Sequence, residues 1–299
     1  MARFRLSGGM MVFLGAFLWS LCSPLVKSLQ VDAFLILGLR SLLAGLTLTA
    51  FIRPKQLKWN GWMLMYVVSY LGLTMAVVVG LTMTSPPIVL GMQYASLIML
   101  FVINFIKTRI FDIKAFIPVC IILTGVVLFM LSDTTGSNLA GNLVALSCGV
   151  FFGGMTLSSK KASGGNALGL TAVANYFTFL VVTLIFPAKM AGVFVLNGKE
   201  WIMMLIQGVI QVGGGYAFYN LGLQRVSPQK ATVIALWEVV MGPLWVVIFL
   251  GEYPVLLEIL GLVVIMAGIF LDAKLNVSAE HETEKKMIES ERYEAAGGI

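Results

Sequence analysis

Long apolar runs separated by short polar connections occur along most of this chain. Ten of these runs are about 20 residues long, which is the length an α-helix needs to cross the hydrocarbon core of a bilayer. The pattern therefore predicts ten transmembrane helices, over residues 8–28, 33–52, 62–82, 87–106, 115–132, 140–158, 168–187, 201–222, 230–250 and 255–272. Residues 273–299 break the pattern, because they are rich in glutamate and contain the lone histidine, and we expect them to form a polar tail in solvent.

The composition excludes several classes of protein. The chain is 59% hydrophobic and only 11% charged, whereas a soluble domain is about 25% charged. Lipid must therefore be its main solvent, so a soluble enzyme, a disulfide-stapled secreted domain and a disordered chain are all excluded. The net charge of +6 is scattered over short loops, so no nucleic-acid partner is expected. The partners that remain are the lipid bilayer and a small-molecule substrate.

Neither a cofactor nor a metal is predicted. The three cysteines have no metal or redox spacing, and His281 lies alone in the polar tail. The chain has no Walker pattern for ATP, no HExxH motif and no pair of catalytic groups within the spans. The sequence therefore indicates a protein that is not an enzyme.

The basic residues indicate how the bundle is oriented. Twelve lysine and arginine residues of the loops and the N-terminal segment fall on one side of the predicted bundle, and three fall on the other: Lys27, Lys189 and Lys199. Basic residues are enriched in cytoplasmic loops. We therefore expect a multi-pass protein of the cell (inner) membrane with both termini in the cytoplasm.

The two halves of the chain resemble each other. Residues 80–86 read GLTMTSP, and residues 222–228, which lie 142 positions later, read GLQRVSP. Further matches at nearly the same spacing join Gly72 to Gly214 and Gly125 to Gly268. The matches predict a duplication, with one repeat over residues 1–135 and a second over residues 136–272.

An odd number of helices per repeat has a topological consequence. Because each repeat holds five spans, the second repeat must enter the membrane from the opposite face. The sequence therefore predicts an all-α membrane protein with ten transmembrane helices in two inverted five-helix repeats. This arrangement is typical of transporters, whose substrate site lies near the bilayer midplane between the repeats.

The second half carries the clearest local motifs. Ser227-Pro228 precedes the ninth span, Gly242-Pro243 interrupts it, Leu250-Gly251-Glu252 closes it, and Gly261 and Gly268 follow on the tenth. With the five-plus-five layout, this pattern resembles the drug/metabolite transporter (DMT) superfamily, specifically its EamA-like members. The first half matches less well, since its fourth span lacks the proline and has Arg109 where Glu252 would fall.

The resemblance implies a fold and a general function. It implies a cavity formed mainly by spans 1, 3, 4, 6, 8 and 9, with spans 5 and 10 outside it. It also implies the export of amino acids or related small metabolites. These expectations concern residues 8–272 and do not identify the substrate.

Glu238 is the first candidate for a substrate-binding residue. It lies about eight residues from either end of the ninth predicted span, and an ionisable group at that depth is a functional candidate by default. A carboxylate there could hold a cationic or zwitterionic substrate. It could also carry a coupling proton, since burial favours the neutral form. The alternative is a protonated carboxyl that only joins helices.

Other polar and aromatic residues of the spans complete the predicted substrate site. The further candidates are Trp237, Gln93, Tyr94, Trp19, Gln207, Gln211, Tyr219 and Asn220. Four of them (Trp19, Tyr94, Tyr219 and Trp237) could form an aromatic box around Glu238, suited to an organic cation or an aromatic amino acid. Helix packing is the alternative role for each of them, and for Gly213-Gly214-Gly215. Arg40, in the second span, is expected to be structural.

Together these features predict a secondary-active transporter of small metabolites such as amino acids or organic cations. It would work by alternating access, as an exporter, with proton coupling as one option. Two alternatives remain open at this point. One is an uptake carrier for a cationic or quaternary-amine metabolite, and the other is a membrane scaffold that transports nothing.

Overall fold

The fold was analysed in a computed structural model. It describes residues 6–295 apart from 54, 58, 133–138, 224, 227–230, 232–233 and 236. Within these residues the regular structure is entirely helical, as the composition predicts.

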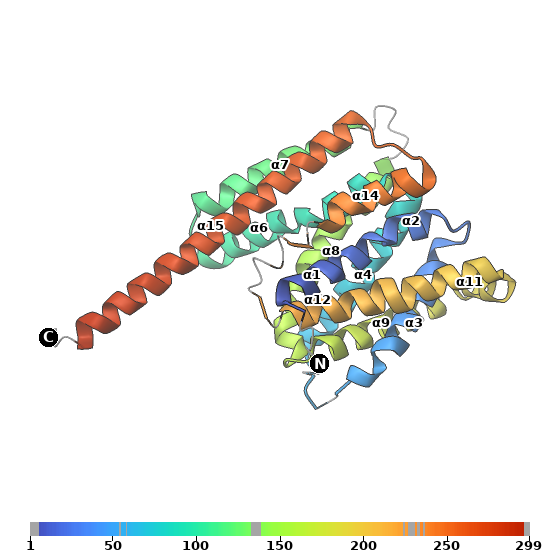
Figure 1. Cartoon of the computed structure of the whole chain (residues 1–299), viewed down its shortest axis with the longest axis horizontal. Coiled ribbons are helices and arrows are strands. Elements are labelled where there is room, and N and C mark those ends of the chain that lie inside the picture. The colour runs from blue at the N-terminus through green and yellow to red at the C-terminus, as the bar shows by residue number, and fades with distance from the viewer. Residues whose placement is uncertain are drawn as a thin grey trace.

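The helices follow one another with short connections (Figure 1). In chain order they are α1 (Gly8–Ser20), α2 (Cys22–Lys27), α3 (Ala33–Leu48), η1 (Thr49–Phe51), α4 (Gly61–Met83), α5 (Pro86–Met92), η2 (Gln93–Ala95), α6 (Ser96–Thr108), α7 (Ile113–Ser132), α8 (Leu139–Ser163), α9 (Ala167–Ile185), α10 (Pro187–Met190), η3 (Ala191–Val195), α11 (Gly198–Leu205), η4 (Ile206–Gly214), α12 (Gly215–Leu223), α14 (Trp237–Leu250) and α15 (Leu256–Ala295).

Nine helical segments of the described chain are long and apolar enough to cross a membrane. Each coincides with a predicted span, and the ends agree within three residues. The exception is the predicted span 230–250. Its apolar helix is described from Trp237 to Leu250, which is shorter than a full crossing, and most of residues 230–236 lie outside the described chain.

Helices that occupy equivalent places in the two sequence halves pack side by side and antiparallel. In the pair α7/α15, Gly125 contacts Gly261 and Ile265, while Gly268 contacts Pro118 and Ile122. The contacts run in opposite directions along the chain, so the two helices are antiparallel. Figure 1 shows this pair along one edge of the bundle.

The pair α3/α9 has the same geometry. Gly45 of α3 contacts Tyr176, Gly38 contacts Val182, and Gly169 of α9 lies against the carbonyl of Phe51. Glycine at these crossings allows backbones to approach closely, which is how helices associate in lipid without a hydrophobic driving force between them.

Two further helix pairs join the halves. One is α4 with α8 and the other is α1 with α12, and each helix pair is again antiparallel. The first pair joins predicted spans 3 and 6, and the second joins spans 8 and 1. A two-fold exchange of the halves would convert each pair into the other.

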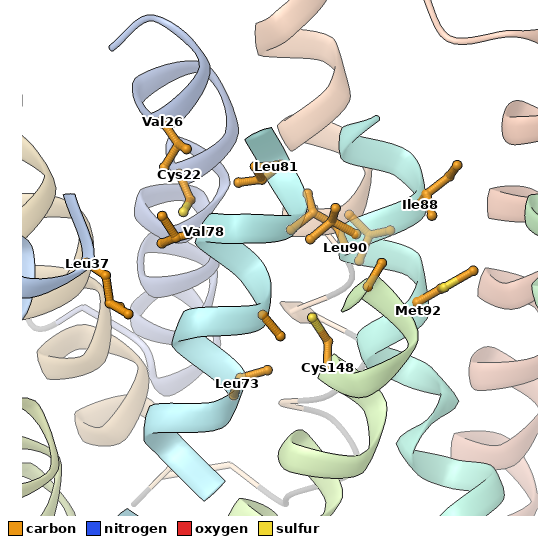
Figure 2. Close-up of a cluster of buried hydrophobic side chains, with 14 of the residues drawn as sticks. Cys22, Val26, Leu37, Leu73, Val78, Leu81, Ile88, Leu90, Met92 and Cys148 are labelled. Carbon is orange, nitrogen blue, oxygen red and sulfur yellow. The ribbon is translucent and has the colours of Figure 1, made fainter. Parts of the chain in front are cut away.

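The buried apolar core lies where α2, α4, α5 and α8 meet. Figure 2 shows Leu81, Leu90, Met92 and Cys148 among the side chains that converge there from α4, α5 and α8. The outer surface is apolar too, with large hydrophobic side chains exposed on most of the long helices, as lipid contact requires.

The last helix is longer than its predicted span. α15 continues past residue 272 to Ala295, so the predicted polar tail is helical in its first part. Figure 1 shows this helix extending beyond the rest of the bundle to the C-terminus.

An ion pair between the halves fixes the start of α3. Asp32 caps this helix by accepting a hydrogen bond from the Phe34 amide at 2.9 Å, and Lys189 lies 2.7 Å from its carboxylate. Partial burial raises the pKa of Asp32, but the hydrogen bonds from Lys189 and Phe34 outweigh that effect, so the net pKa is below its ordinary value. The contact therefore stabilises the fold above the ordinary aspartate pKa, and this stability is lost as pH falls through the lowered value.

We expect Asp32→Asn and Asp32→Ala to differ in stability. Asparagine keeps the helix cap and removes the ion pair, which at this exposure contributes at most about 1 kcal/mol. Alanine removes both the helix cap and the ion pair, and loss of the cap lowers the free energy of unfolding by about 1 kcal/mol more. The free energy of unfolding in detergent, measured for both variants from neutral pH downwards, gives the contributions of the ion pair and of the helix cap. Equal stability of the two variants would show that the cap contributes nothing.

Candidate functional site

A cavity of about 600 Å³ lies between the two halves of the bundle. Its lining comes from α1 to α4, from the segment η2–α6, from α8 and α9, and from η4, α12 and α14. None of its described lining residues belongs to α7 or α15, which agrees with the expectation that spans 5 and 10 lie outside. Arg40 of α3 and Thr171 of α9 show that spans 2 and 7 contribute as well.

The cavity gathers most of the residues predicted to bind substrate. Those that line it are Trp19, Gln93, Tyr94, Gln211, Tyr219, Asn220 and Glu238. They come from four separate predicted spans, so only the fold brings them together. Their role in binding stays a prediction.

Two predicted residues do not line the cavity. The side chain of Trp237 is 49% exposed and packs edge-on against Phe13, with ring centroids 5.9 Å apart. It follows that Trp237 points away from its neighbour Glu238, because successive residues on a helix lie about 100° apart. Gln207 is fully buried but is enclosed by protein instead of facing the cavity.

A row of aromatic rings forms one wall of the cavity. The Trp19 ring lies 4.7 Å from that of Tyr216 and 4.6 Å from that of Tyr219, and Tyr70 lies 5.8 Å from Tyr216. Tyr66 extends the row from α4, with its ring 6.2 Å from that of Tyr70. The predicted contact between Trp19 and Tyr219 is therefore present, but Tyr66, Tyr70 and Tyr216 were missed. The four-residue spacing of the first two was the available signal.

The helix that carries Gln211 is locally unwound. Residues Ile206–Gly214 form a π-helix, a conformation that is rare and concentrated at functional sites. The glycines also allow close approach: a Cβ at Gly215 would lie 2.5 Å from the Trp19 ring, and one at Gly213 would lie 3.0 Å from Thr47. The glycine run therefore takes part in close helix packing, and the π-helix ends within it.

Glu238 is the acidic residue among the described residues that line the cavity. It is partly accessible from the cavity and interacts electrostatically with Tyr94 and Tyr219. Within the described chain no hydrogen bond or ion pair reaches its carboxylate. Such a carboxylate is free to receive a cationic group or a proton.

Arg40 supplies a positive charge at the cavity, and its interpretation as a structural residue stays a prediction. It is 3% exposed, and its guanidinium donates to Cys22 Sγ and to the carbonyl of Thr74, each at 3.3 Å. On α9, Asn175 donates to the Tyr70 hydroxyl at 2.9 Å and fixes that ring.

The described residues contain no cluster of His, Cys, Asp or Glu that could hold a metal ion. The described lining residues of the cavity offer one carboxylate, one guanidinium, several amides and an aromatic wall. This set can bind an organic molecule.

The second half of the chain matches a family model, whereas a solved structure is similar over most of the chain. Residues 139–272 match the model of the EamA-like transporter family. No curated protein matches the chain. One solved structure, titled only as the crystal structure of a protein, is similar over 90% of this chain and 97% of its own, with a TM-score of 0.61 and 16% identity. At that identity the likeness shows the shared fold alone.

The family match confirms the resemblance drawn from the motifs of the second half. It indicates a membrane transporter of the drug/metabolite type, and many apolar helices agree with it. Residues 139–272 of this multi-pass membrane protein are therefore similar to the EamA-like transporter family.

Proposed function

We propose that the chain is a secondary-active transporter that exports small cationic or zwitterionic metabolites by alternating access. The observation that carries this proposal is the cavity of about 600 Å³ between the two halves, with Glu238 exposed to it. That volume suits a small organic molecule. A scaffold without a transport function has no use for an ionisable group in such a cavity.

The antiparallel helix pairs support an inverted repeat. Predicted spans 2 and 7 occupy equivalent places in the two repeats, as do spans 5 and 10, and the members of each pair run in opposite directions. Inversion predicts this relation. Two such halves can exchange conformations, and the exchange moves the opening of the cavity from one membrane face to the other.

The ion pairs between the halves that the structure describes lie at one end of the bundle, whereas hydrogen bonds such as that from Asn166 to the Phe51 carbonyl join the halves at the other end. Lys27 at the end of α2 forms an ion pair with Glu252 after α14, and Ser85 donates to Glu258 at 2.6 Å. The cavity instead extends towards the opposite end, where Tyr66 and Ser159 lie near the ends of their helices. By the distribution of basic loops, that opposite end is cytoplasmic.

The ion pair of Lys27 with Glu252 therefore holds the outer end closed. We expect Lys27→Glu to shift the protein towards the outward-open state by about 1.4- to fivefold, since a partly exposed pair contributes about 0.2–1 kcal/mol. Substrate exchange across proteoliposomes measures the shift. The swapped double variant Lys27→Glu/Glu252→Lys should recover the original rate, and a double variant as altered as the single one would contradict the role.

Flux tests the proposal directly. The full chain, reconstituted in vesicles, is expected to exchange labelled small metabolites saturably, and the same compounds should raise its melting temperature because they bind the folded state. Imposing a proton gradient tests coupling. Saturable exchange without any response to the gradient would exclude proton coupling, and no exchange of any metabolite would favour the scaffold.

A further inference from the structure

Arg40 lies at the cavity without a carboxylate partner. Its two hydrogen bonds go to a sulfur and to a backbone carbonyl, and within the described chain no acid forms an ion pair with it. A guanidinium has five N–H donors in a planar fork that fits a carboxylate. Inside a membrane-spanning bundle an uncompensated charge is costly and marks a functional position.

The two charges of the cavity lie apart. Arg40 and Glu238 both interact electrostatically with Cys22 and Tyr216, yet they do not form an ion pair with each other. Arg40 also interacts with Tyr70, whereas Glu238 interacts with Tyr94 and Tyr219. Arg40 and Glu238 therefore line the cavity as two separate charged groups, beside an aromatic wall.

We propose that Arg40 is an anion-binding subsite that receives the carboxylate of a zwitterionic substrate, whose ammonium group faces Glu238. This inference rests on the transport function proposed above and narrows its substrate class. One carboxylate and one ammonium would balance both charges of the cavity. An organic cation or quaternary amine without an acid group would leave Arg40 uncompensated, so such compounds are poor substrates.

Matched ligands test the subsite on the wild-type chain. A panel of L-amino acids is screened by thermal stabilisation and by exchange in proteoliposomes. Each amino acid that binds is then compared with its methyl ester and with its decarboxylated amine. We expect both derivatives to bind at least about tenfold more weakly, because charge-assisted bidentate hydrogen bonds are lost.

The variant Arg40→Gln gives the second measurement. The preference for acid over ester should fall to about one, while Arg40→Lys should keep part of it. This ratio would not change if Arg40 were only structural. If Arg40→Gln does not fold, the comparison on the wild-type chain decides alone.

The other outcomes overturn the inference in distinguishable ways. Esters or amines that bind as tightly as the acids would exclude a carboxylate subsite, as would an acid preference that survives in Arg40→Gln. Exchange of other metabolites but of no amino acid would refute the zwitterion class and leave the transport function standing. Absence of exchange for every metabolite would refute both.

Discussion

Glu238→Gln abolishes or uncouples transport while the protein remains folded. Glutamine keeps the size and hydrogen-bonding capacity of the side chain but carries neither the charge nor an exchangeable acidic proton. Hydrogen bonds to charged groups contribute about 1.5–3 kcal/mol, so substrate affinity should fall about 10- to 150-fold. Exchange of a substrate identified by the metabolite screen, across proteoliposomes, measures the loss.

Stability separates this effect from misfolding. Within the described chain the carboxylate has no partner, and a neutral amide costs less at membrane depth than a charge. The melting temperature of Glu238→Gln should therefore match or exceed that of the wild type. Normal, pH-dependent exchange in this variant would remove Glu238 from the mechanism.

Glu200→Gln is the matched control. Glu200 lies at the start of α11, away from the cavity, where its side chain and that of Asn197 form a reciprocal helix cap. Glutamine can occupy the same position of such a cap. The same chemical change should therefore leave both transport and stability unchanged.

Periodicity and span length predicted the helices well, because in lipid each crossing must satisfy its own backbone hydrogen bonds. For the predicted span 230–250 the structure describes an apolar helix over Trp237–Leu250, and the full length of this span stays a prediction, because most of residues 230–236 lie outside the described chain. Helix association was less predictable. It depends on which small residues face each other, such as Gly125 and Gly261, and a single sequence does not state which faces meet.

The site was predictable where a residue was unusual for its depth. Glu238 and Gln93 stood out as polar side chains within apolar spans, and both line the cavity. Trp237 was placed beside Glu238 by sequence adjacency, but adjacent helical residues point in different directions. Arg40 was interpreted as structural because its side chain could reach a polar partner from that depth, and the structure shows such partners in Cys22 and the Thr74 carbonyl.

Gly15→Ala is expected to destabilise the protein strongly, because Gly15 lies where α1 and α12 cross closely. A Cβ at Gly15 would lie 2.8 Å from the backbone nitrogen of Tyr219 and 2.9 Å from the carbonyl oxygen of Gly215. Both are backbone atoms, so the helices must separate. Overpacking of this kind costs about 1–3 kcal/mol and occasionally more.

The crossing also positions the aromatic wall. Trp19 lies one turn beyond Gly15 on α1 and contacts Tyr219 with ring centroids 4.6 Å apart. Separation of the helices must therefore disturb the cavity as well as the packing. We expect Gly15→Ala to lower the melting temperature in detergent and to impair substrate exchange together.

Gly9→Ala, on the same helix, is the control for this substitution. Among the described residues, a Cβ there would meet only the Ile234 side chain, at an ordinary contact distance of 3.6 Å. Alanine favours a helix over glycine by up to about 1 kcal/mol, so this variant should be as stable as the wild type or more stable. If the two alanine variants have the same melting temperature and the same rate of substrate exchange, α1 and α12 do not cross as closely as described. The contact of Trp19 with Tyr219 in the aromatic wall of the cavity would then be wrong as well.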